Sequence, residues 1–284
     1  MISANDKYRD SLFRSFFNEP NRLLALCNSV LNTSYDDPTK LQINTLEGIL
    51  FNSQRNDISC TIDNHFLVLV EHQSSVNNNM PFRCLSYVAE LLNNLIPNKK
   101  KIYQQALISF PAPKFFVLYN GNKTEPIKKT MRLSDAFNGD SSSLELIVTA
   151  FNINYELNPP LLGKCHYLKD YSTLVGKVKE SLAQGLSLHE AISRAVKFCI
   201  EHEIMSNYLI EHSEEVFNML ALEWNIEDAK QAWQEEAREQ GRVEEREIFA
   251  LKLIQRGRSI QEIHEDTGLP IQHIQQLIND KLVT

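Results

Sequence analysis

The 284-residue sequence has no excess of positive charge, no paired-cysteine motif and no long apolar segment. Its formal net charge of −7 argues against a protein that coats nucleic acid through bulk electrostatics, because non-specific affinity comes largely from Lys and Arg that neutralise phosphates. The five cysteines are odd in number and widely scattered, without the CxxC spacing of a zinc site. We therefore expect reduced, mostly buried thiols at Cys27, Cys60, Cys84, Cys165 and Cys199.

Targeting and membrane-spanning patterns are also missing. The first dozen residues carry charge too early for a secretory signal, and no apolar run approaches the roughly 20 residues that cross a bilayer. The hydrophobic fraction of 43% and the charged fraction of 23% are ordinary for a globular protein. These features predict a cytoplasmic protein without a membrane partner, built from a main domain and an appendage.

Apolar patterns in the first half of the chain predict a β-hairpin. Residues 57–63 alternate between polar and apolar, which is typical of a strand buried on one face. After the turn residues Asp63 and Asn64, the run FLVLV at 66–70 has the composition of a strand covered on both faces. Further strands are predicted over 42–51, over KFFVLYNG at 114–121 and over LELIVTAFNINY at 144–155.

Helical periodicity occupies most of the remaining chain. Apolar stripes predict two helices before residue 32, with Pro20 in a first helical turn, and a third helix from Pro81 to Ile96. Helical spacing then continues from about residue 160 to 240. We therefore predict an α/β core over 1–158, a helical region over 159–240 that packs on or extends it, and a small helical tail over 241–284.

The tail contains a pattern like a helix-turn-helix. Apolar residues flank a Thr-Gly turn within RSIQEIHEDTGLPIQHIQQLI at 258–278. The second helix of this pattern carries glutamines and a histidine but no Arg or Lys, and over 251–284 four basic residues balance four acidic ones. The composition slightly favours a protein-interaction or oligomerisation module, compatible with a homodimer, over sequence-specific reading of DNA.

The apolar strand at 66–70 ends abruptly in the polar residues EHQ. Glu71 and Gln73 are two positions apart and share a strand face, so the side chain of His72 is expected on the other face. If the two strands pair about the predicted turn, Asp57 lies beside Glu71 at one edge of the sheet. On spacing alone, turn-forming polar residues explain such a pattern more often than a functional site does.

Two carboxylates in such a position have a chemical consequence. Like charges on a partly buried surface repel each other and lose hydration, so a cation or a proton must neutralise them. Magnesium takes oxygen ligands, usually one or two carboxylates completed by waters and phosphate oxygens. Hydrolysis of phosphodiester bonds fits that chemistry.

Three blocks of the sequence together resemble a known nuclease family: RNDISCTID at 55–63, LVEHQSSVNNNMPFRCLSYVAELL at 69–92 and FFVLYNG at 115–121. The chain resembles the Rpn family of recombination-promoting nucleases and transposases, a branch of the PD-(D/E)XK superfamily. In that superfamily an acid on the second strand, an E-x-K motif on the third strand and a following helix build the active site. The resemblance implies an α/β fold with a restriction-endonuclease-like core, in which helices flank a mixed central β-sheet, and an α-helical C-terminal region.

The resemblance also implies roles for individual residues. Asp57 and Glu71 would be catalytic, metal-binding carboxylates, and the backbone carbonyl of His72 would be a further metal ligand. Gln73 takes the position of the catalytic lysine, and Asn56 replaces the proline of the motif name. A glutamine can orient a water but supplies no positive charge and is a poor general base, although the Rpn branch commonly has it. Mg²⁺ is the implied cofactor, with Mn²⁺ as an alternative.

Other residues are candidate contacts to DNA phosphates. Arg83 and Tyr87 lie four positions apart on one face of the helix after the motif. A surface arginine and a packed tyrosine explain these two residues equally well. A local basic patch is the second candidate, although charge runs are more often plain solvated surface; it consists of Lys99, Lys100 and Lys101.

The expected activity is that of a metal-dependent DNA endonuclease linked to recombination or transposition, with double-stranded DNA as partner. The ion lowers the pKa of a water that attacks the phosphodiester in line. Glu47 is a lesser candidate for a third acid, with an exposed strand residue as the default interpretation. Two alternatives stay open: a catalytically weak DNA-binding or transposition-accessory protein with the same fold, and a protein-interaction factor acting through the helical tail.

Overall fold

The computed structural model describes residues 12–44, 57–138, 143–222, 224, 245–254, 256 and 258–282, with side chains described up to Leu277. The chain divides into two compact units, Met1–Glu223 and Trp224–Thr284. The first unit is mixed α/β and the second is helical, as the sequence predicts. Within the described residues, no helix is both long and apolar enough to cross a membrane.

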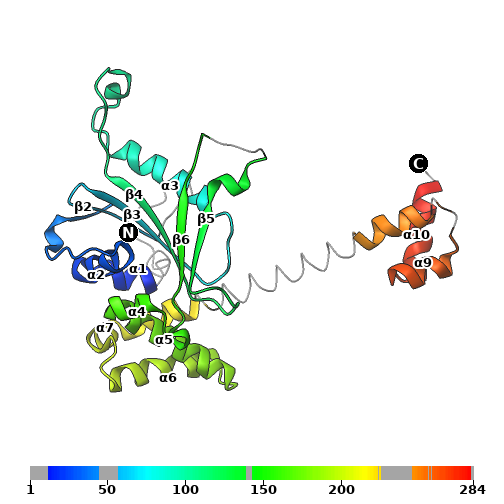
Figure 1. The fold of residues 1–284 in the computed structure, drawn as a ribbon. Helices are drawn as coiled ribbons and strands as arrows, with labels where there is room; N and C mark the ends of the chain where they lie inside the picture. The colour runs from blue at the N-terminus through cyan, green and yellow to red at the C-terminus, as the bar shows by residue number, and fades with distance from the viewer. Residues whose placement is uncertain are drawn as a thin grey trace, which may run out of the picture. The chain divides into compact units, whose positions relative to one another are not determined.

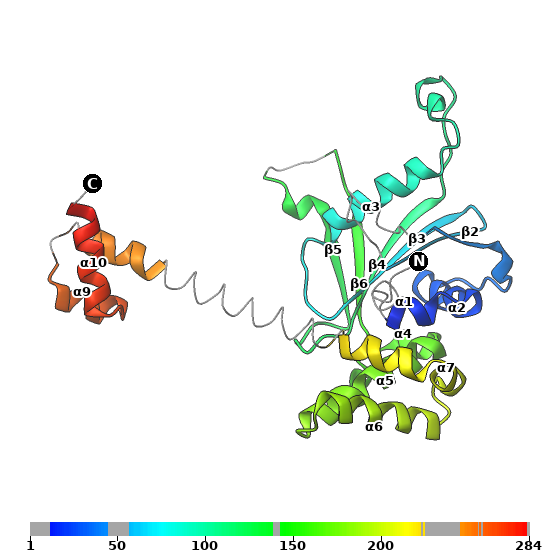
Figure 2. The same ribbon diagram turned by 180° about the vertical axis from the view of Figure 1, so that it is seen from behind.

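A six-stranded mixed sheet lies at the centre of the described part of the first unit (Figure 1 and Figure 2). Its order is β1-β2-β3-β4-β6-β5; β3 pairs in parallel with β4 and β4 with β6, and the other neighbours are antiparallel. The parallel strands therefore end at the same edge of the sheet. The strands are β1 (Leu41–Ile43), β2 (Ile58–Ile62), β3 (Phe66–Gln73), β4 (Ala112–Tyr119), β5 (Lys128–Arg132) and β6 (Ile147–Asn152).

A tight turn joins β2 to β3. Its central residues, Asp63 and Asn64, have φ angles of 47° and 54°, and the N–H of His65 donates to the carbonyl of Ile62 at 2.9 Å. Positive φ at both central positions is the type I′ geometry, which Asp and Asn tolerate better than other residues with a Cβ. The predicted hairpin is confirmed. The strand predicted over 42–51 is represented by β1, and residues 45–51 lie outside the described part of the chain.

β2 is buried on both faces, so the prediction of a half-buried strand is wrong. All five of its residues are buried, including the polar residues Ser59 and Thr61. These residues pair with Leu69 and Leu67 of β3, and the hydroxyl of Thr61 accepts a hydrogen bond from the amide of Asn44. A small hydroxyl group can be buried when it is hydrogen-bonded. The alternation of polar and apolar residues in β2 therefore does not mean that one face of the strand is exposed to solvent.

One face of the sheet is covered by α3 (Met80–Asn94). Pro81 lies in its first turn, where the missing N–H has no intrahelical partner to lose, and the helix predicted for this segment is confirmed. The helix packs on β3, β4, β5 and β6 through one apolar cluster, which includes Leu67, Leu69, Met80, Cys84, Tyr87, Val88, Leu91, Val117, Met131 and Val148.

Helices from both ends of the first unit cover the opposite face (Figure 1): α1 (Leu12–Phe17), α2 (Pro20–Leu31) and α5 (His166–Ala183). The ring of Phe13 stacks on His72 with centroids 5.0 Å apart, and Sγ of Cys27 lies 3.4 Å from Sγ of Cys60. All five cysteines are free and buried, which confirms the prediction from their spacing.

Further helical elements complete the first unit. Three more α-helices follow the sheet in sequence, and four short 3₁₀ turns lie in the connections of the described residues. They are α4 (Pro160–Lys164), α6 (Leu188–Glu201), α7 (Ser206–Glu211), η2 (Pro38–Lys40), η3 (Lys99–Tyr103), η4 (Leu133–Ala136) and η5 (Tyr155–Leu157). Residues 213–222 are also helical. The continuous helical signal from residue 160 thus corresponds to a bundle that begins with α4 and α5.

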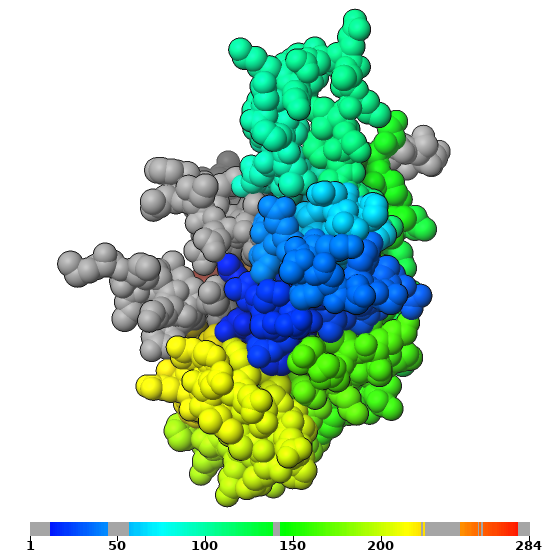
Figure 3. Space-filling view, turned by 90° about the vertical axis from the view of Figure 1, so that its left-hand side faces the viewer, coloured from blue at the N-terminus to red at the C-terminus, as the bar shows by residue number. Residues whose placement is uncertain are grey.

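An arm, residues 97–111, connects α3 to β4 and stands out from the surface of the first unit (Figure 3). It carries η3 and the basic run of three lysines. Its tip also exposes apolar side chains: Tyr103 is 90% exposed and Leu107 is 97% exposed. The arm lies at the start of β4, at the opposite edge of the sheet from the end of β3.

β5 is a strand that the sequence pattern did not predict. Its sequence KKTMR has one buried residue, Met131, and pairs along one side only, with β6. Charged side chains are typical of an edge strand, where they discourage pairing with other chains. The position of β5 at the edge of the sheet therefore explains the basic side chains of this segment.

The second unit is a small helical cluster. Residues 245–254, α9 (Ile260–Thr267) and α10 (Ile271–Leu282) are helical. Ser259 and Glu262 form a capping box at the start of α9, and Gly268 ends it with a φ of 68°. The buried residues are Ala250, Leu253, Ile263, Leu269 and Ile274. The predicted pair of helices about a Thr-Gly turn is present.

Candidate active site

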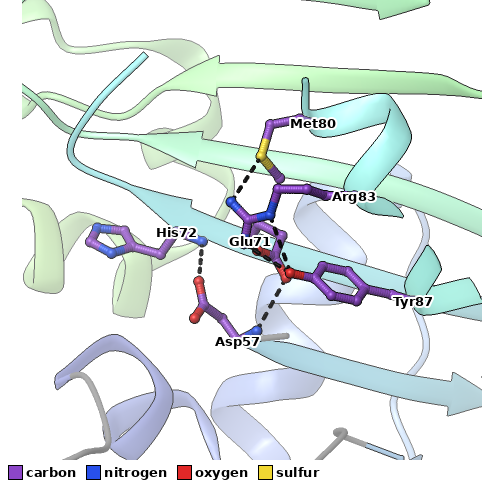
Figure 4. A network of polar contacts seen from close by, with 6 residues as sticks. All are labelled: Asp57, Glu71, His72, Met80, Arg83 and Tyr87. Atoms are coloured by element: carbon purple, nitrogen blue, oxygen red, sulfur yellow. Dashed lines mark hydrogen bonds and ion pairs between the residues drawn. The ribbon is translucent and has the colours of Figure 1, made fainter. Parts of the chain in front are cut away.

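Asp57 and Glu71 lie side by side at the open end of the β2–β3 hairpin. The register pairs Ile58 with Val70, so these two acids are the next positions along the strands. The N–H of Asp57 donates to Oε1 of Glu71 at 3.2 Å, and the N–H of His72 donates to Oδ2 of Asp57 at 2.6 Å (Figure 4). The hairpin register therefore brings the two predicted acids together.

Glu71 is enclosed by the surrounding structure, with 1% of its surface exposed. Burial and the neighbouring Asp57 carboxylate raise the pKa of Glu71 to about 8, against the opposing effect of Arg83. Burial also raises the pKa of Asp57, although the hydrogen bond from His72 and the charges of Arg83 and Arg14 lower it in part. The pair therefore keeps a proton near neutral pH unless more positive charge reaches it.

The helix α3 supplies a guanidinium group to the acids. Nη2 of Arg83 lies 3.0 Å from Oε2 of Glu71 and donates to the hydroxyl of Tyr87 at 2.9 Å (Figure 4). Nη1 of Arg83 also contacts Sδ of Met80 at 3.4 Å. The predicted i, i+4 pair thus meets on one helix face, directly against the acidic pair.

Two neighbours of Glu71 are held in their neutral forms. Burial and the charge of Glu71 raise the pKa of the Tyr87 phenol, so the hydroxyl keeps its proton and serves as a neutral partner of Arg83. Burial raises the pKa of the Cys84 thiol to about 12. This thiol is therefore a packing residue and not a nucleophile.

His72 points to the opposite face of β3, as the strand alternation predicts. Nε2 of its ring lies 3.2 Å from the hydroxyl of Tyr171 on α5, and the ring stacks on Phe13. Burial and the charge of Lys179 lower the pKa of His72 to about 4, so the ring is neutral at pH 7. His72 contributes to the acidic site through its main chain, and its side chain fixes the strand from behind.

Lys179 on α5 holds the ends of the parallel strands together. Its Nζ donates to the carbonyls of Asn120 and Gly121, which follow β4, and to Oδ1 of Asn154, which follows β6. Burial lowers the pKa of Lys179 to about 8. Gly121 also lies close to Ser74, and a Cβ atom added at Gly121 would overlap the carbonyl oxygen of Ser74. Sequence reasoning missed this clamp, because a lysine within a helical pattern carries no sign of distant partners.

Gln73 follows Glu71 on the same face of β3 and is half-buried. It opens onto a small cleft of about 30 Å³ between the start of α3 and the segment that connects β4 to β5. The main-chain carbonyl of Gln73 accepts from the N–H of Asn120 at 3.1 Å, which ties β3 to β4 at this edge. The predicted glutamine therefore stands between the acidic pair and the cleft.

The predicted basic run lies away from the acidic pair. The basic run follows the C-terminal end of α3, while Arg83 is in its first turn, and the 15 residues of this helix span roughly 22 Å. The run consists of Lys99, Lys100 and Lys101, of which Lys99 donates to Oδ1 of Asn93 at 3.0 Å. Glu47 and Asn56 lie outside the described residues.

A cation at this site would be held by oxygen atoms. No cluster of three or more His, Cys, Asp or Glu side chains suited to a metal occurs in the part of the chain that the structure describes. The candidate donors are therefore the carboxylates of Asp57 and Glu71 and the main-chain carbonyl of His72. Comparison of the chain with family models, with curated proteins and with solved structures found no match.

Proposed function

We propose that the protein is a nuclease that hydrolyses phosphodiester bonds of double-stranded DNA with the help of a divalent cation. One observation carries this proposal: the pKa values of both Asp57 and Glu71 are raised, although the guanidinium of Arg83 lies against them. The buried pair thus has too little positive charge around it. A hard cation supplies such charge and accepts oxygen ligands, and Mg²⁺ or Mn²⁺ meets both conditions.

The places of these residues in the fold support a nuclease of the Rpn type within the PD-(D/E)XK superfamily. Asp57 directly precedes the second strand, Glu71 lies on the third strand and Arg83 lies on the helix that follows. These are the positions that the sequence resemblance implies. A mixed sheet with helices on both faces is also compatible with such a core. The link to recombination or transposition rests on the resemblance alone.

The donor set fits a small hard cation. Carboxylate oxygens come from two adjacent strand ends, and the carbonyl of His72 belongs to the residue directly after Glu71. When bound, Mg²⁺ lowers the pKa of a water and offsets charge on the phosphate. Glu71 would lose its proton in that state, because the added positive charge removes the main cost of ionising it beside Asp57.

The side chains of this chain then have separate tasks. Asp57 and Glu71 would hold the cation, and the remaining N–H groups of Arg83 would donate to phosphate oxygens. The amide of Gln73 has a donor and an acceptor and would orient the attacking water, but it does not take its proton. Tyr87 keeps Arg83 in place through its hydroxyl.

Plasmid cleavage with purified protein tests this proposal. Wild type should nick or cut DNA in Mg²⁺, and Asp57→Asn and Glu71→Gln should each lose that activity while their circular dichroism spectra stay unchanged. Asp63→Asn is a matched control, since it removes an exposed acid of the same hairpin at a position whose positive φ suits Asn. Equal cutting by wild type and both site variants would falsify the assignment.

A second candidate is a DNA-binding protein with little catalysis. The contact between Arg83 and Glu71 favours it, because the guanidinium already occupies one oxygen of the acid. The uncharged Gln73 points in the same direction, since it stabilises developing negative charge less than a lysine does. Salt-sensitive DNA binding that persists in both site variants, without cutting by wild type, would identify this function.

A further inference from the structure

The arm, residues 97–111, combines positive charge with exposed apolar side chains. It carries three lysines and no acid, although the whole chain has a formal net charge of −7. Tyr103 is 90% exposed, Leu107 is 97% exposed and Ile102 is 53% exposed. The arm stands out from the surface of the first unit (Figure 3), so these side chains face solvent. Single exposed apolar residues are common, but a projecting group of them marks a contact surface.

The lysines of the arm can still accept an anionic partner. Lys99 donates to the uncharged side chain of Asn93, and Lys100 and Lys101 are exposed and form no ion pair with an acid among the described residues. Side chains three positions apart lie on the same side of a 3₁₀ helix, so Lys100 and Tyr103 share one side of η3. The arm therefore presents a cation and an aromatic ring in the same direction.

A DNA duplex matches both properties of the arm. Its phosphates attract the lysines. Proteins that bind the minor groove insert apolar side chains between base steps, and aromatic rings stack on bases. A lipid surface fits less well, because binding at such a surface uses a longer amphipathic helix and η3 has five residues. The combination of charge and apolar groups therefore favours DNA as the partner of the arm.

The strand register gives the distance between the arm and the acidic pair along the sheet. Ala112, which directly follows the arm, pairs with Phe66, and Glu71 pairs with Val117. Ala112 and Val117 are five positions apart on β4, which corresponds to roughly 17 Å along a strand. This length equals about five steps of 3.4 Å along DNA. A duplex that runs along β4 with a phosphate at the acids would therefore meet the arm about five base pairs or more from the cut.

We propose that the arm is a DNA wedge: Lys100 and Lys101 contact phosphates, while Tyr103 and Leu107 enter the minor groove and separate two stacked base pairs. The proposal rests on the nuclease function proposed above and adds a binding element to it. Insertion costs unstacking energy and kinks the duplex. A bent duplex contacts more protein surface than a straight one. It can therefore meet the projecting arm and the recessed Glu71, which is 1% exposed, at the same time.

Substitution of the exposed apolar residues tests the proposal. The serine variant, Tyr103→Ser with Leu107→Ser, removes both wedge side chains, and it should keep the wild-type unfolding curve because both are almost fully exposed. Gln104→Ser with Gln105→Ser is the matched control, since it changes two exposed polar residues of the same arm. The probe is a short DNA duplex with a dye at each end, with Ca²⁺ in place of Mg²⁺ to slow hydrolysis. Energy transfer between the dyes reports the bend, and titration gives the affinity.

Wild type and the glutamine control should both raise the energy transfer between the duplex ends. The serine variant should lose that rise and bind DNA at least about tenfold more weakly, which corresponds to ~1.4 kcal/mol. Its affinity should keep the wild-type dependence on salt, because no charge is removed, whereas Lys100→Ala with Lys101→Ala should make that dependence shallower. In wild type alone of these two, 2-aminopurine placed along the duplex should brighten about five base pairs or more from the cut, and not in the serine variant.

The outcomes separate this proposal from the nuclease function. If wild type cuts DNA and the serine variant binds and bends it as wild type does, the wedge proposal is overturned and the nuclease function stands. If wild type neither binds nor cuts DNA, the nuclease function is overturned, and the wedge proposal falls with it. Sedimentation of both proteins tests other partners of the arm. Loss of a dimer, or of binding to phosphatidylserine vesicles, in a serine variant with unchanged DNA affinity would also contradict the wedge proposal.

Discussion

Glu71 and His72 are consecutive residues of β3 that lie on opposite faces of the sheet. Burial keeps both side chains uncharged near neutral pH, because it raises the pKa of Glu71 to about 8 and lowers that of His72 to about 4. Their neighbours differ in kind. Glu71 faces a second acid and a guanidinium, whereas His72 is packed between the rings of Phe13 and Tyr171.

The difference supports the functional role proposed for one face and a structural role for the other. Aromatic packing and hydrogen bonds with Tyr171 and Asn120 satisfy the neutral imidazole of His72, so that side needs no further partner. On the other side, two acids share the positive charge of Arg83 and still have raised pKa values. Such an unmet demand for positive charge is a physical sign of a binding or catalytic site.

The largest expected difference between the two neighbours is in activity. Glu71→Gln should reduce Mg²⁺-dependent cleavage by at least about 100-fold, or ~2.7 kcal/mol, because it removes a ligand charge while it keeps the shape. His72→Gln should stay within a few fold of wild type, since its carbonyl and N–H are unchanged. Single-turnover cleavage of a labelled duplex measures both. Equal losses of cleavage activity in Glu71→Gln and His72→Gln would contradict the assignment of different roles to the two faces of β3.

The second prediction concerns stability at the Glu71 face. The folded-state pKa of Glu71 lies above its value of about 4.5 in an unfolded chain, so the folded protein binds more protons between these values. The free energy of unfolding should therefore fall as pH rises from about 4.5 to 8, by on the order of 4 kcal/mol from this residue. Urea unfolding followed by circular dichroism should show a flatter profile in Glu71→Gln. Added Mg²⁺ should stabilise wild type more at pH 8 than at pH 5.

At the His72 face the pH dependence should have the opposite sign. The folded-state pKa lies below the unfolded value of 6.5, so the unfolded chain binds more protons between about 4 and 6.5. Stability should then be complete above pH 6.5 and fall by about 2 to 3 kcal/mol as the pH drops to 4. His72→Gln should lose this acid-side slope and keep the slope assigned to Glu71. If His72→Gln kept the acid-side slope of stability against pH, that slope would not come from His72. The His72 ring would then be solvated in the folded protein.

A smaller effect is expected from the clamp behind the site. Lys179→Met should destabilise the first unit by about 1 to 3 kcal/mol, because it leaves the buried carbonyls of Asn120 and Gly121 without their donor. Cleavage per folded molecule should fall less than in Glu71→Gln. The two effects can be separated by unfolding curves and by rates normalised to the folded fraction. An unchanged free energy of unfolding in Lys179→Met would show that water replaces the ammonium group as the donor to these carbonyls.

The smallest effect on the chemical step is expected at the arm. Replacing Lys99, Lys100 and Lys101 together by Ala should leave the single-turnover rate at saturating DNA unchanged, since the arm lies far from the acids. It should weaken DNA binding and make the salt dependence shallower, by up to about 0.9 in slope for each phosphate that is no longer neutralised. Filter binding over a salt series measures this. A large decrease of the saturated rate would place the arm at the reaction centre.

Local patterns predicted the parts of the fold that local forces decide. The turn at Asp63 and Asn64, the alternation of Glu71, His72 and Gln73, and the stripe of α3 all follow from spacing along a strand or a helix. The same spacing predicted that Asp57 would meet Glu71. These features need only neighbours within one hairpin and the helix after it.

Long-range packing decided what the sequence did not reveal. β2 is buried on both faces because of where the hairpin sits in the sheet, and its polar residues are small enough to be buried. β5 is a strand because β6 offers it an edge. Lys179 finds its partners on loops after β4 and β6, and neither its own helix nor its charge indicates them.

The tight turn between β2 and β3 also bears on the order in which the protein folds. It joins Asp57 to Glu71 across a separation of only 14 positions, so closing this loop costs little entropy and the hairpin can pair early. The two carboxylates would then meet while they are still hydrated. They would lose this water only when α3 docks on the sheet. That docking step must be accompanied by the uptake of a proton or a cation. The folding rate of the first unit should therefore depend on pH and on magnesium, even in a chain that never meets DNA.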